Sequence, residues 1–172
     1  MSRILLFTDG SVNTQSNVGY GAYLSVNEGA PFDADNLPSI HLKVFEQTSS
    51  TKLELQTLLW ALEEVKSSGA HIVIHTDSQN IIGLPNRRER FEKSHFLTKK
   101  NKLIGNYLLY QAFYKMMDEL ECTLVKVKGH KLSDDKDEMD RYFTLVDRVS
   151  REALRKSAIG VRAFYQENPV LM

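Results

Sequence analysis

Three acidic residues stand where a carboxylate is hard to explain by solubility alone. Asp9 follows the apolar run at residues 4–7, Asp77 follows an apolar run at 72–74, and Glu54 lies near the start of a segment with helical spacing of leucines. Because a buried, unpaired carboxylate is costly, such acids require a cation or a proton. Clustered carboxylate oxygens suit Mg²⁺ or Mn²⁺, and two such ions about 4 Å apart can promote phosphodiester hydrolysis.

Each acid also has a purely structural explanation. Asp9-Gly-Ser and Asp77-Ser-Gln are typical of turns or helix N-caps, in which a short acidic side chain accepts backbone hydrogen bonds. Thr51-Lys-Leu-Glu54 matches a capping box, in which the glutamate bonds back to the start of its own helix. Both interpretations stay open at the level of sequence. The positions of histidine and cysteine do not favour zinc.

The elements that must position these acids follow from the hydrophobic pattern. It predicts strands at 3–11, 18–26, 40–48, 71–76 and 123–128, and helices at 51–68, 103–120 and 143–155, with a helix-turn region reaching residue 85. A hairpin followed by helix-strand crossovers indicates an α/β fold, with a mixed sheet flanked by helices. Such a sheet brings Asp9 and Asp77 to adjacent strand ends and the first turn of the 51–68 helix close to them.

Length and composition limit the possible classes of protein. The 172 residues predict one domain at 1–157, followed by a C-terminal tail at 158–172. Twenty-two Lys and Arg balance 22 Asp and Glu, which excludes a polycation that binds nucleic acid through bulk charge. The single cysteine, Cys122, excludes an internal disulfide. With no apolar stretch of membrane-spanning length, we expect a soluble, cytoplasmic protein with no membrane association and no obligate protein partner.

One segment carries a strong local charge. Seven basic residues face two acidic ones between positions 86 and 102, a local charge of +5; they are Arg87, Arg88, Arg90, Lys93, Lys99, Lys100 and Lys102. Neutralising phosphates is the minimum requirement for binding a nucleic-acid duplex. An ordinary solvated connection between helices is the alternative.

Four short motifs, taken together in their order and spacing, resemble a known family. Phe7-Thr-Asp-Gly-Ser11, the helix Leu53-Glu-Leu-Gln-x-Leu-x-x-Ala-Leu62, Thr76-Asp-Ser-Gln79 and Lys128-Gly-His130 are similar to those of type 1 ribonuclease H. The resemblance covers residues 3 to 156. It implies a ribonuclease H-like fold with a five-stranded mixed sheet, and cleavage of the RNA strand of RNA-DNA hybrids with two Mg²⁺ ions held by four carboxylates, Mn²⁺ serving as a substitute. Asp9, Glu54 and Asp77 match three of the four.

The fourth carboxylate comes from the start of the last helix in this family. Asp147 fits because it lies beside the apolar stripe Tyr142, Val146, Val149 and Ala153 and is followed by the small Ser150. Asp140 is the alternative, but it ends an acidic run typical of a solvated loop. The resemblance also implies that His130 assists proton transfer or product release.

The resemblance further implies roles and contacts. Asp9 would bridge both metals, Glu54 and Asp77 would complete one metal and position the scissile phosphate, Asp147 would hold the second metal, and the products would carry a 5′-phosphate and a 3′-hydroxyl. Expected substrate contacts are Gly10, Ser11, Ser50, Thr51, Gln79, Arg87, Arg88, Lys99 and Lys100. The chain departs from the family at Ser50-Thr51-Lys52, where an Asn commonly precedes the glutamate, and this departure bears on substrate preference.

Two other functions share these features. A nuclease of the same superfamily can keep the carboxylates and cut DNA, although Gln79 and the Gly10-Ser11 pair favour RNA. A non-catalytic module that binds hybrids is the third hypothesis, and it is disfavoured because all four carboxylates are present.

Overall fold

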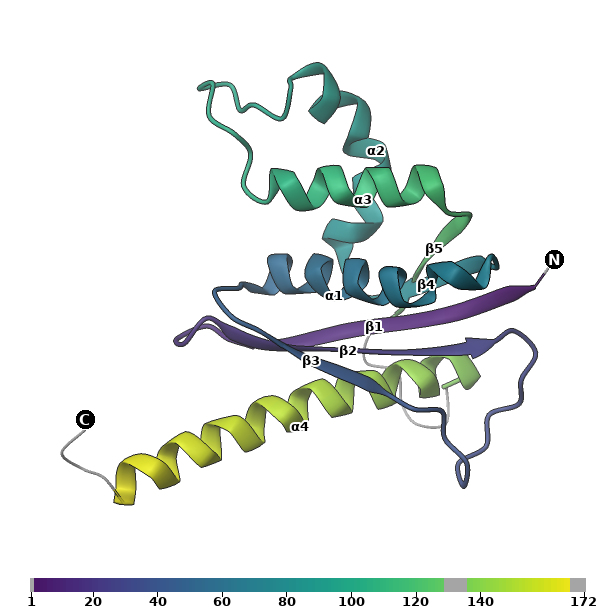
Figure 1. Cartoon of the computed structure of the whole chain (residues 1–172), viewed down its shortest axis with the longest axis vertical. Coiled ribbons are helices and arrows are strands. Elements are labelled where there is room, and N and C mark those ends of the chain that lie inside the picture. Colours follow the sequence, from purple (N-terminus) through teal and green to yellow (C-terminus); the bar gives the residue numbers. More distant parts are fainter. Residues whose placement is uncertain (1, 129–135, 168–172) are drawn as a thin grey trace.

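The fold is built on a five-stranded sheet in the order β3-β2-β1-β4-β5 (Figure 1). The computed structural model describes residues 2–128 and 136–167, with side chains described up to residue 157. The strands are β1 (Arg3–Asn13), β2 (Val18–Asn27), β3 (His41–Phe45), β4 (His71–Thr76) and β5 (Cys122–Lys126). The helices are α1 (Ser50–Val65), the short η1 (Lys66–Ser68), α2 (Gln79–Lys93), α3 (Tyr107–Glu119) and α4 (Glu138–Glu167).

The strand directions confirm the predicted mixed sheet. β1 pairs antiparallel with β2, with Asp9 opposite Ala22, and parallel with β4, with Phe7 opposite His75. β3 adds antiparallel to β2, and β5 adds parallel to β4. The two parallel pairs require crossovers, which the helices between these strands provide.

Helices cover the sheet on both sides, and each side has its own hydrophobic core. α1 lies against one face with α2 and α3 stacked beyond it, and α4 lies against the other face (Figure 1). Because side chains alternate along a strand, Leu6 of β1 enters the core on the α1 side, whereas Leu5 and Phe7 enter the core on the α4 side. The α4 side also buries Tyr142 and Val146, two members of the apolar stripe that the sequence predicted for this helix.

The capping box predicted at Thr51–Glu54 is wrong. The N-cap of α1 is Ser49, whose hydroxyl accepts a hydrogen bond from the Lys52 amide at 3.4 Å. The cap stands two residues earlier than expected because Ser49, and not Thr51, has the extended backbone of a cap residue. Glu54 therefore lies beyond the capping positions, and its carboxylate is available for other contacts.

Several elements are longer or shorter than the sequence predicted. β1 continues to Asn13, past the predicted strand end at Ser11, so the interpretation of Asp9-Gly-Ser as a turn is wrong. α2 continues through Pro85, and α3 begins at Tyr107 because the preceding chain forms a bridge between Leu97 and Leu103. Within the described residues, no helix is both long and apolar enough to cross a membrane.

α4 extends beyond both ends of the predicted 143–155 helix. It starts at Glu138, where the Asp140 amide donates to Asp137 Oδ1 at 2.8 Å and the Asp137 amide donates to Asp140 Oδ2 at 3.1 Å. This reciprocal pair satisfies backbone donors at the helix start, which explains the earlier beginning. The helix ends at Glu167, so it passes the boundary expected between domain and tail at residue 157.

Candidate active site

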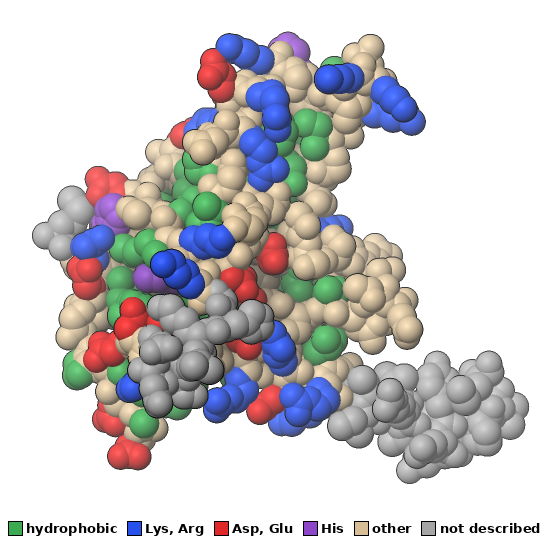
Figure 2. All heavy atoms as spheres, turned by 180° about the vertical axis from the view of Figure 1, so that it is seen from behind, with side chains coloured by type: hydrophobic (Ala, Val, Ile, Leu, Met, Phe, Trp, Pro, Cys, Tyr) green, Lys and Arg blue, Asp and Glu red, His purple; other side chains and the backbone are tan. Residues whose placement is uncertain are grey.

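Four carboxylates line one open pocket of about 370 Å³. Asp9 comes from β1, Glu54 from α1, Asp147 from α4, and Asp77 directly follows β4. The full lining is Asp9, Gly10, Ser11, Val12, Glu54, Asp77, Asp147, Arg151 and Leu154. Figure 2 shows acidic side chains near the middle of this face, with Lys and Arg around them. The structure thus brings together the four acids that the sequence analysis singled out.

Asp9 reaches the pocket from the centre of the sheet. It alternates with the buried Thr8 and shares the α4 side of β1 with Phe7. The next residue, Gly10, allows α1 to lie close to the strand, because a Cβ there would be only 2.8 Å from Leu53 Cδ2. This close approach brings Glu54, the neighbour of Leu53, to the same end of the sheet.

Ser78 links two of the acidic segments. Its hydroxyl donates to Glu54 Oε2 at 2.5 Å and accepts from the Ile81 amide at 3.2 Å, so it caps α2 while holding Glu54. The cap of α2 is therefore Ser78, and the interpretation of Asp77 as a helix cap is wrong. Asp77 precedes the cap with an exposed side chain at the pocket.

Asp147 is positioned by the close packing of α4 on β1. Ser150, one turn later, is fully buried, and its Oγ lies 3.2 Å from Ser11 Oγ. Two small hydroxyl side chains at this crossing let the helix approach the strand, which places Asp147 at the pocket. Asp140 lies at the start of α4, bonded to Asp137, and does not line the pocket.

The pKa values of Asp9 and Glu54 are both raised, and burial is the main cause in each. The pKa of Asp9 rises from 3.8 to about 8, first because the side chain is buried, then because it shares a hydrogen bond with Asp147 and is repelled by Asp77. Burial also raises the pKa of Glu54, with a contribution from Asp77, while the hydrogen bond from Ser78 opposes the rise. A cation bound between these carboxylates would favour their ionised forms, because a nearby positive charge stabilises a carboxylate.

Arg151 is a member of the pocket that the sequence analysis missed. Its Nε donates to Asp147 Oδ1 at 2.8 Å, and this hydrogen bond is the main cause of the raised pKa of the guanidinium. Asp9 and Asp77 contribute to the same rise. The signal available in the sequence was the spacing of four residues between Asp147 and Arg151, which places opposite charges on one side of a helix.

The donor set of the pocket fits a hard divalent cation. All four acids offer oxygen, the ligand type that Mg²⁺ and Mn²⁺ prefer. Across residues 2–128 and 136–157, no three acidic, histidine or cysteine side chains already surround a common point at metal-binding distance. Instead, Glu54 is bound by Ser78 and Asp147 by Arg151. The backbone positions suit a shared cation, and the side chains would have to turn from these partners to bind it.

The other predicted site residues are more scattered. Gly10 and Ser11 line the pocket, whereas Gln79 lies exposed on the first turn of α2, and Ser50 and Thr51 lie exposed on the first turn of α1. None of these last three lines the pocket. His130 falls outside the described residues.

The basic stretch lies on α2 and the connection to α3, away from the pocket lining. Arg88 binds Asp118 through both terminal nitrogens, at 2.6 and 2.7 Å, and Glu92 through Nε at 2.8 Å. Arg87 donates to the main chain and side chain of Asn80.

These two guanidinium groups therefore stabilise α2 and its contact with α3, and neither residue lines the pocket. Lys99 and Lys100 are exposed in the connection. Figure 2 shows Lys and Arg side chains gathered over this end of the molecule.

Comparison with known proteins agrees with this geometry. The RNase H family model matches residues 1–153. The chain belongs to the ribonuclease H family. It is 25% identical to the ribonuclease H of Syntrophomonas wolfei over 90% of this chain and 98% of that protein, and 26% identical to the ribonuclease H of Ruthia magnifica over 87% and 99%. Membership makes it a nuclease that acts on RNA-DNA hybrids.

Solved structures share the fold. The solution structure of the prototype foamy virus RNase H domain has a TM-score of 0.70 at 14% identity, covering 88% of this chain and 93% of that domain. The foamy viral protease-reverse transcriptase in complex with an RNA/DNA hybrid has a TM-score of 0.63 at 8% identity, covering 88% of this chain and 19% of that protein. The predicted ribonuclease H-like fold is confirmed.

Proposed function

We propose that the carboxylate pocket hydrolyses the RNA strand of RNA-DNA hybrids in the manner of type 1 ribonuclease H, with two divalent cations. The single observation that carries the proposal is the convergence of Asp9, Glu54, Asp77 and Asp147 from four elements in one open pocket. Cleavage leaves a 5′-phosphate on one product and a 3′-hydroxyl on the other.

The residues present fit the cations that this chemistry needs. Mg²⁺ is the proposed ion, with Mn²⁺ able to replace it, because every side-chain donor is a carboxylate oxygen. When bound, such ions supply a water of lowered pKa and neutralise charge on the leaving oxygen. The unfavourable ionisation of Asp9 in their absence supports cation binding here, since a nearby positive charge favours the charged form of a carboxyl group.

Each acid has a distinct part in this proposal. Asp9, which is coupled to both Asp77 and Asp147, would contribute to both ion sites. Glu54, oriented by Ser78, and Asp77 would serve one ion and Asp147 the other. His130 remains the proposed carrier of a proton to or from the reacting oxygens.

The substrate would approach along the pocket rim. Gly10 and Ser11 line the pocket, and we assign their main chain, together with Gln79, Ser50 and Thr51, to the 2′-hydroxyl side of the hybrid. Lys99 and Lys100, exposed on the α2–α3 connection, are assigned to phosphates of the DNA strand. A related fold that was solved with an RNA/DNA hybrid supports this class of substrate.

The test is cleavage of end-labelled RNA-DNA hybrid, single-stranded RNA and double-stranded DNA with Mg²⁺, Mn²⁺ or EDTA. We expect metal-dependent cutting of the RNA strand in the hybrid alone, lost in Asp77→Asn. Cutting of the DNA duplex instead would indicate that the protein is a DNA nuclease of the same superfamily. Binding of the hybrid with no cutting under any metal would indicate a binding module.

A further inference from the structure

Two arginines of α4, Arg148 and Arg155, differ from the other arginines of the protein. Both are exposed, and neither makes a hydrogen bond, an ion pair or a ring contact with any residue that the structure describes. The other arginines with described side chains each bind a carboxylate, an oxygen of Asn80 or the face of an aromatic ring. They are Arg3, Arg87, Arg88, Arg90, Arg141 and Arg151. A guanidinium group that the fold leaves unpaired keeps its planar set of donors for a ligand.

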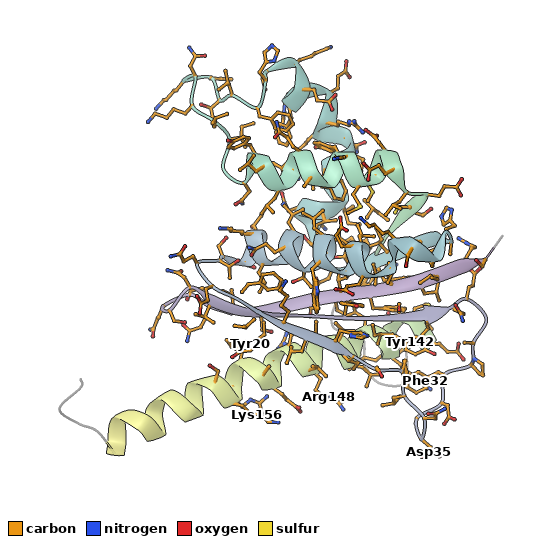
Figure 3. The ribbon with its side chains drawn as sticks, viewed as in Figure 1. Tyr20, Phe32, Asp35, Tyr142, Arg148 and Lys156 are labelled. Atoms are coloured by element: carbon orange, nitrogen blue, oxygen red, sulfur yellow. The ribbon has the colours of Figure 1, made fainter. Side chains whose placement is uncertain are left out.

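These two arginines stand next to residues of the carboxylate pocket. Asp147 and Leu154 line the pocket, and Arg148 and Arg155 follow them directly in the sequence. Successive residues of a helix are turned by about 100°, so each arginine lies one step around α4 from the pocket lining. Figure 3 shows Arg148 on α4, reaching away from the strands. Because Arg148 and Arg155 are seven residues apart, they share one line of the helix about 10.5 Å apart. We call them the arginine pair.

The surface around the arginine pair is positively charged. Four basic residues face one acidic residue between positions 148 and 156, a local charge of +3. The acid, Glu152, lies one turn from each arginine, yet within the described part of the chain it forms an ion pair with neither. Figure 2 shows Lys and Arg side chains gathered over α4, below the acidic side chains of the pocket. Unpaired positive charge at this position suits the phosphate backbone of a nucleic acid.

The arginine pair and the basic stretch lie on opposite sides of the sheet. α2, α3 and their connection stack beyond α1, whereas α4 covers the other face (Figure 1). The carboxylate pocket is lined by residues of both α1 and α4, so it opens between the two groups of basic side chains. A duplex seated on the pocket can therefore contact Lys99 and Lys100 with one strand and the arginine pair with the other.

We propose that the arginine pair binds phosphates of the RNA strand beside the bond that is cut. This inference rests on the proposed function, and it places the RNA strand on the α4 side and the DNA strand on the side of Lys99 and Lys100. The strand that is cut must enter the pocket, so its neighbouring phosphates are the ones within reach of α4. Two guanidinium groups about 10.5 Å apart can bind separate phosphates, because one duplex strand carries a phosphate about every 3.4 Å along its axis.

The first test measures binding of a labelled RNA-DNA hybrid to the full chain by fluorescence anisotropy. All proteins carry Asp77→Asn, so that the hybrid is not cut. Replacing both Arg148 and Arg155 by Ala should raise Kd at least about tenfold and reduce the slope of log Kd against log salt by about 2, one for each phosphate contact.

The matched control replaces Lys115 and Lys156 by Ala and removes the same charge. Lys115 is exposed on α3, and Lys156, nine residues after Asp147, lies on the opposite side of α4 from the pocket. This control should change Kd less than about twofold. Equal weakening by the two double variants would overturn the proposal, because it would show a general effect of net charge.

Shortened hybrids identify the strand that the arginine pair contacts. The RNA strand or the DNA strand is shortened on one side of the cleavage site, while the other strand keeps its full length. Removing the RNA phosphates that lie over α4 should abolish the difference in Kd between the parent and the arginine variant, whereas removing the DNA phosphates should preserve it. A difference that disappears only when the DNA is shortened would overturn the assignment to RNA.

Failure of this inference can be told from failure of the proposed function. If the chain without substitutions cuts the hybrid and the arginine variant binds within about twofold of its parent, only the role of the arginine pair is overturned. If the chain cuts no hybrid, the proposed function fails, and the binding comparison still decides whether α4 holds the RNA strand.

Discussion

The carboxylate pocket and the basic stretch between residues 86 and 102 show two ways of concentrating charge. In the pocket, the fold brings together four acids, and burial, followed by the neighbouring acids, raises the pKa of Asp9 to about 8. In the basic stretch, several charges have nearby partners: Arg88 binds Glu92 one turn further along α2 and Asp118 on α3, and Lys93 binds Glu89. Like charges that the fold brings together without enough counter-charges indicate a site for a ligand. Charged side chains that bind an opposite charge nearby stabilise the fold instead.

The largest expected effect follows from removing one acid of the pocket. Asp147→Asn should lower the rate of hybrid cleavage at least about 100-fold, because an amide cannot supply the negative oxygen that a cation needs. The matched variant is Asp140→Asn, which alters an acid of the same helix that lies outside the pocket lining. Steady-state cleavage of labelled hybrid measures both. Equal losses in the two variants would contradict the assignment of the fourth carboxylate to Asp147.

A second prediction uses the pKa of Asp9 in the metal-free protein. Since this pKa is about 8 in the fold and 3.8 ordinarily, the folded chain binds the proton more tightly, and stability falls as pH rises between these values. Asp9→Asn removes the charge, so in EDTA at pH 8 its Tm should exceed that of the wild type by at least about 3 °C. Differential scanning fluorimetry at pH 4 and pH 8 measures the difference, which should nearly vanish at the lower pH.

Divalent cations should reduce the difference in Tm between Asp9→Asn and the wild type at pH 8. Mg²⁺ stabilises only the chain that binds it, so its addition should raise the Tm of the wild type more than that of Asp9→Asn. A variant that is less stable than the wild type in EDTA at pH 8 would show that Asp9 is a structural carboxylate with a favourable environment.

In the basic stretch we expect smaller effects, on substrate binding for the lysines and on stability for Arg88. Replacing both Lys99 and Lys100 by Ala should raise KM for the hybrid by about three- to tenfold and reduce the salt dependence of binding, with unchanged Tm. Arg88→Ala should do the opposite, lowering Tm by about 1–2 °C through loss of its Asp118 contact and leaving KM within about twofold. A large rise in KM from Arg88→Ala would mean that its guanidinium leaves its partners to bind phosphate.

The smallest expected effect concerns Arg151. Its positive charge competes with a cation for Asp147, so Arg151→Ala should lower the Mg²⁺ concentration for half-maximal cleavage by about two- to fivefold. Arg155→Ala, one turn further along α4, is the control and should leave this midpoint unchanged. A higher midpoint in Arg151→Ala would show that the guanidinium positions Asp147 for the cation and does not compete with it.

Much of this architecture was predictable from the sequence because it rests on local periodicity. The spacing of apolar residues predicted the five strands, and the apolar stripe Tyr142, Val146, Val149 and Ala153 predicted which flank of α4 meets the sheet. Asp9 and Asp77 could be placed at one sheet end because a parallel crossover leaves little choice.

The features of the site that the sequence does not predict depend on contacts between residues distant in the chain. The hydrogen bond from Ser78 to Glu54 and the burial that raises the pKa of Asp9 exist only once α1, α2 and the sheet are assembled. The contact of Arg88 with Asp118 on α3 has the same origin, whereas the local charge of the stretch alone predicts a substrate contact for this arginine. The predicted start of α1 is wrong because several residues able to cap a helix stand together there, from Thr48 to Thr51.

Calorimetric titration of the full chain with Mn²⁺ and Mg²⁺, alongside Asp9→Asn, Asp147→Asn and Asp140→Asn, shows directly whether the pocket binds divalent cations. If the four acids form a shared cation site, the wild type and Asp140→Asn bind the ions and the other two variants lose most of the binding heat. Absence of binding to the wild type, or equal binding by all four proteins, would show that the four acids do not form a cation site.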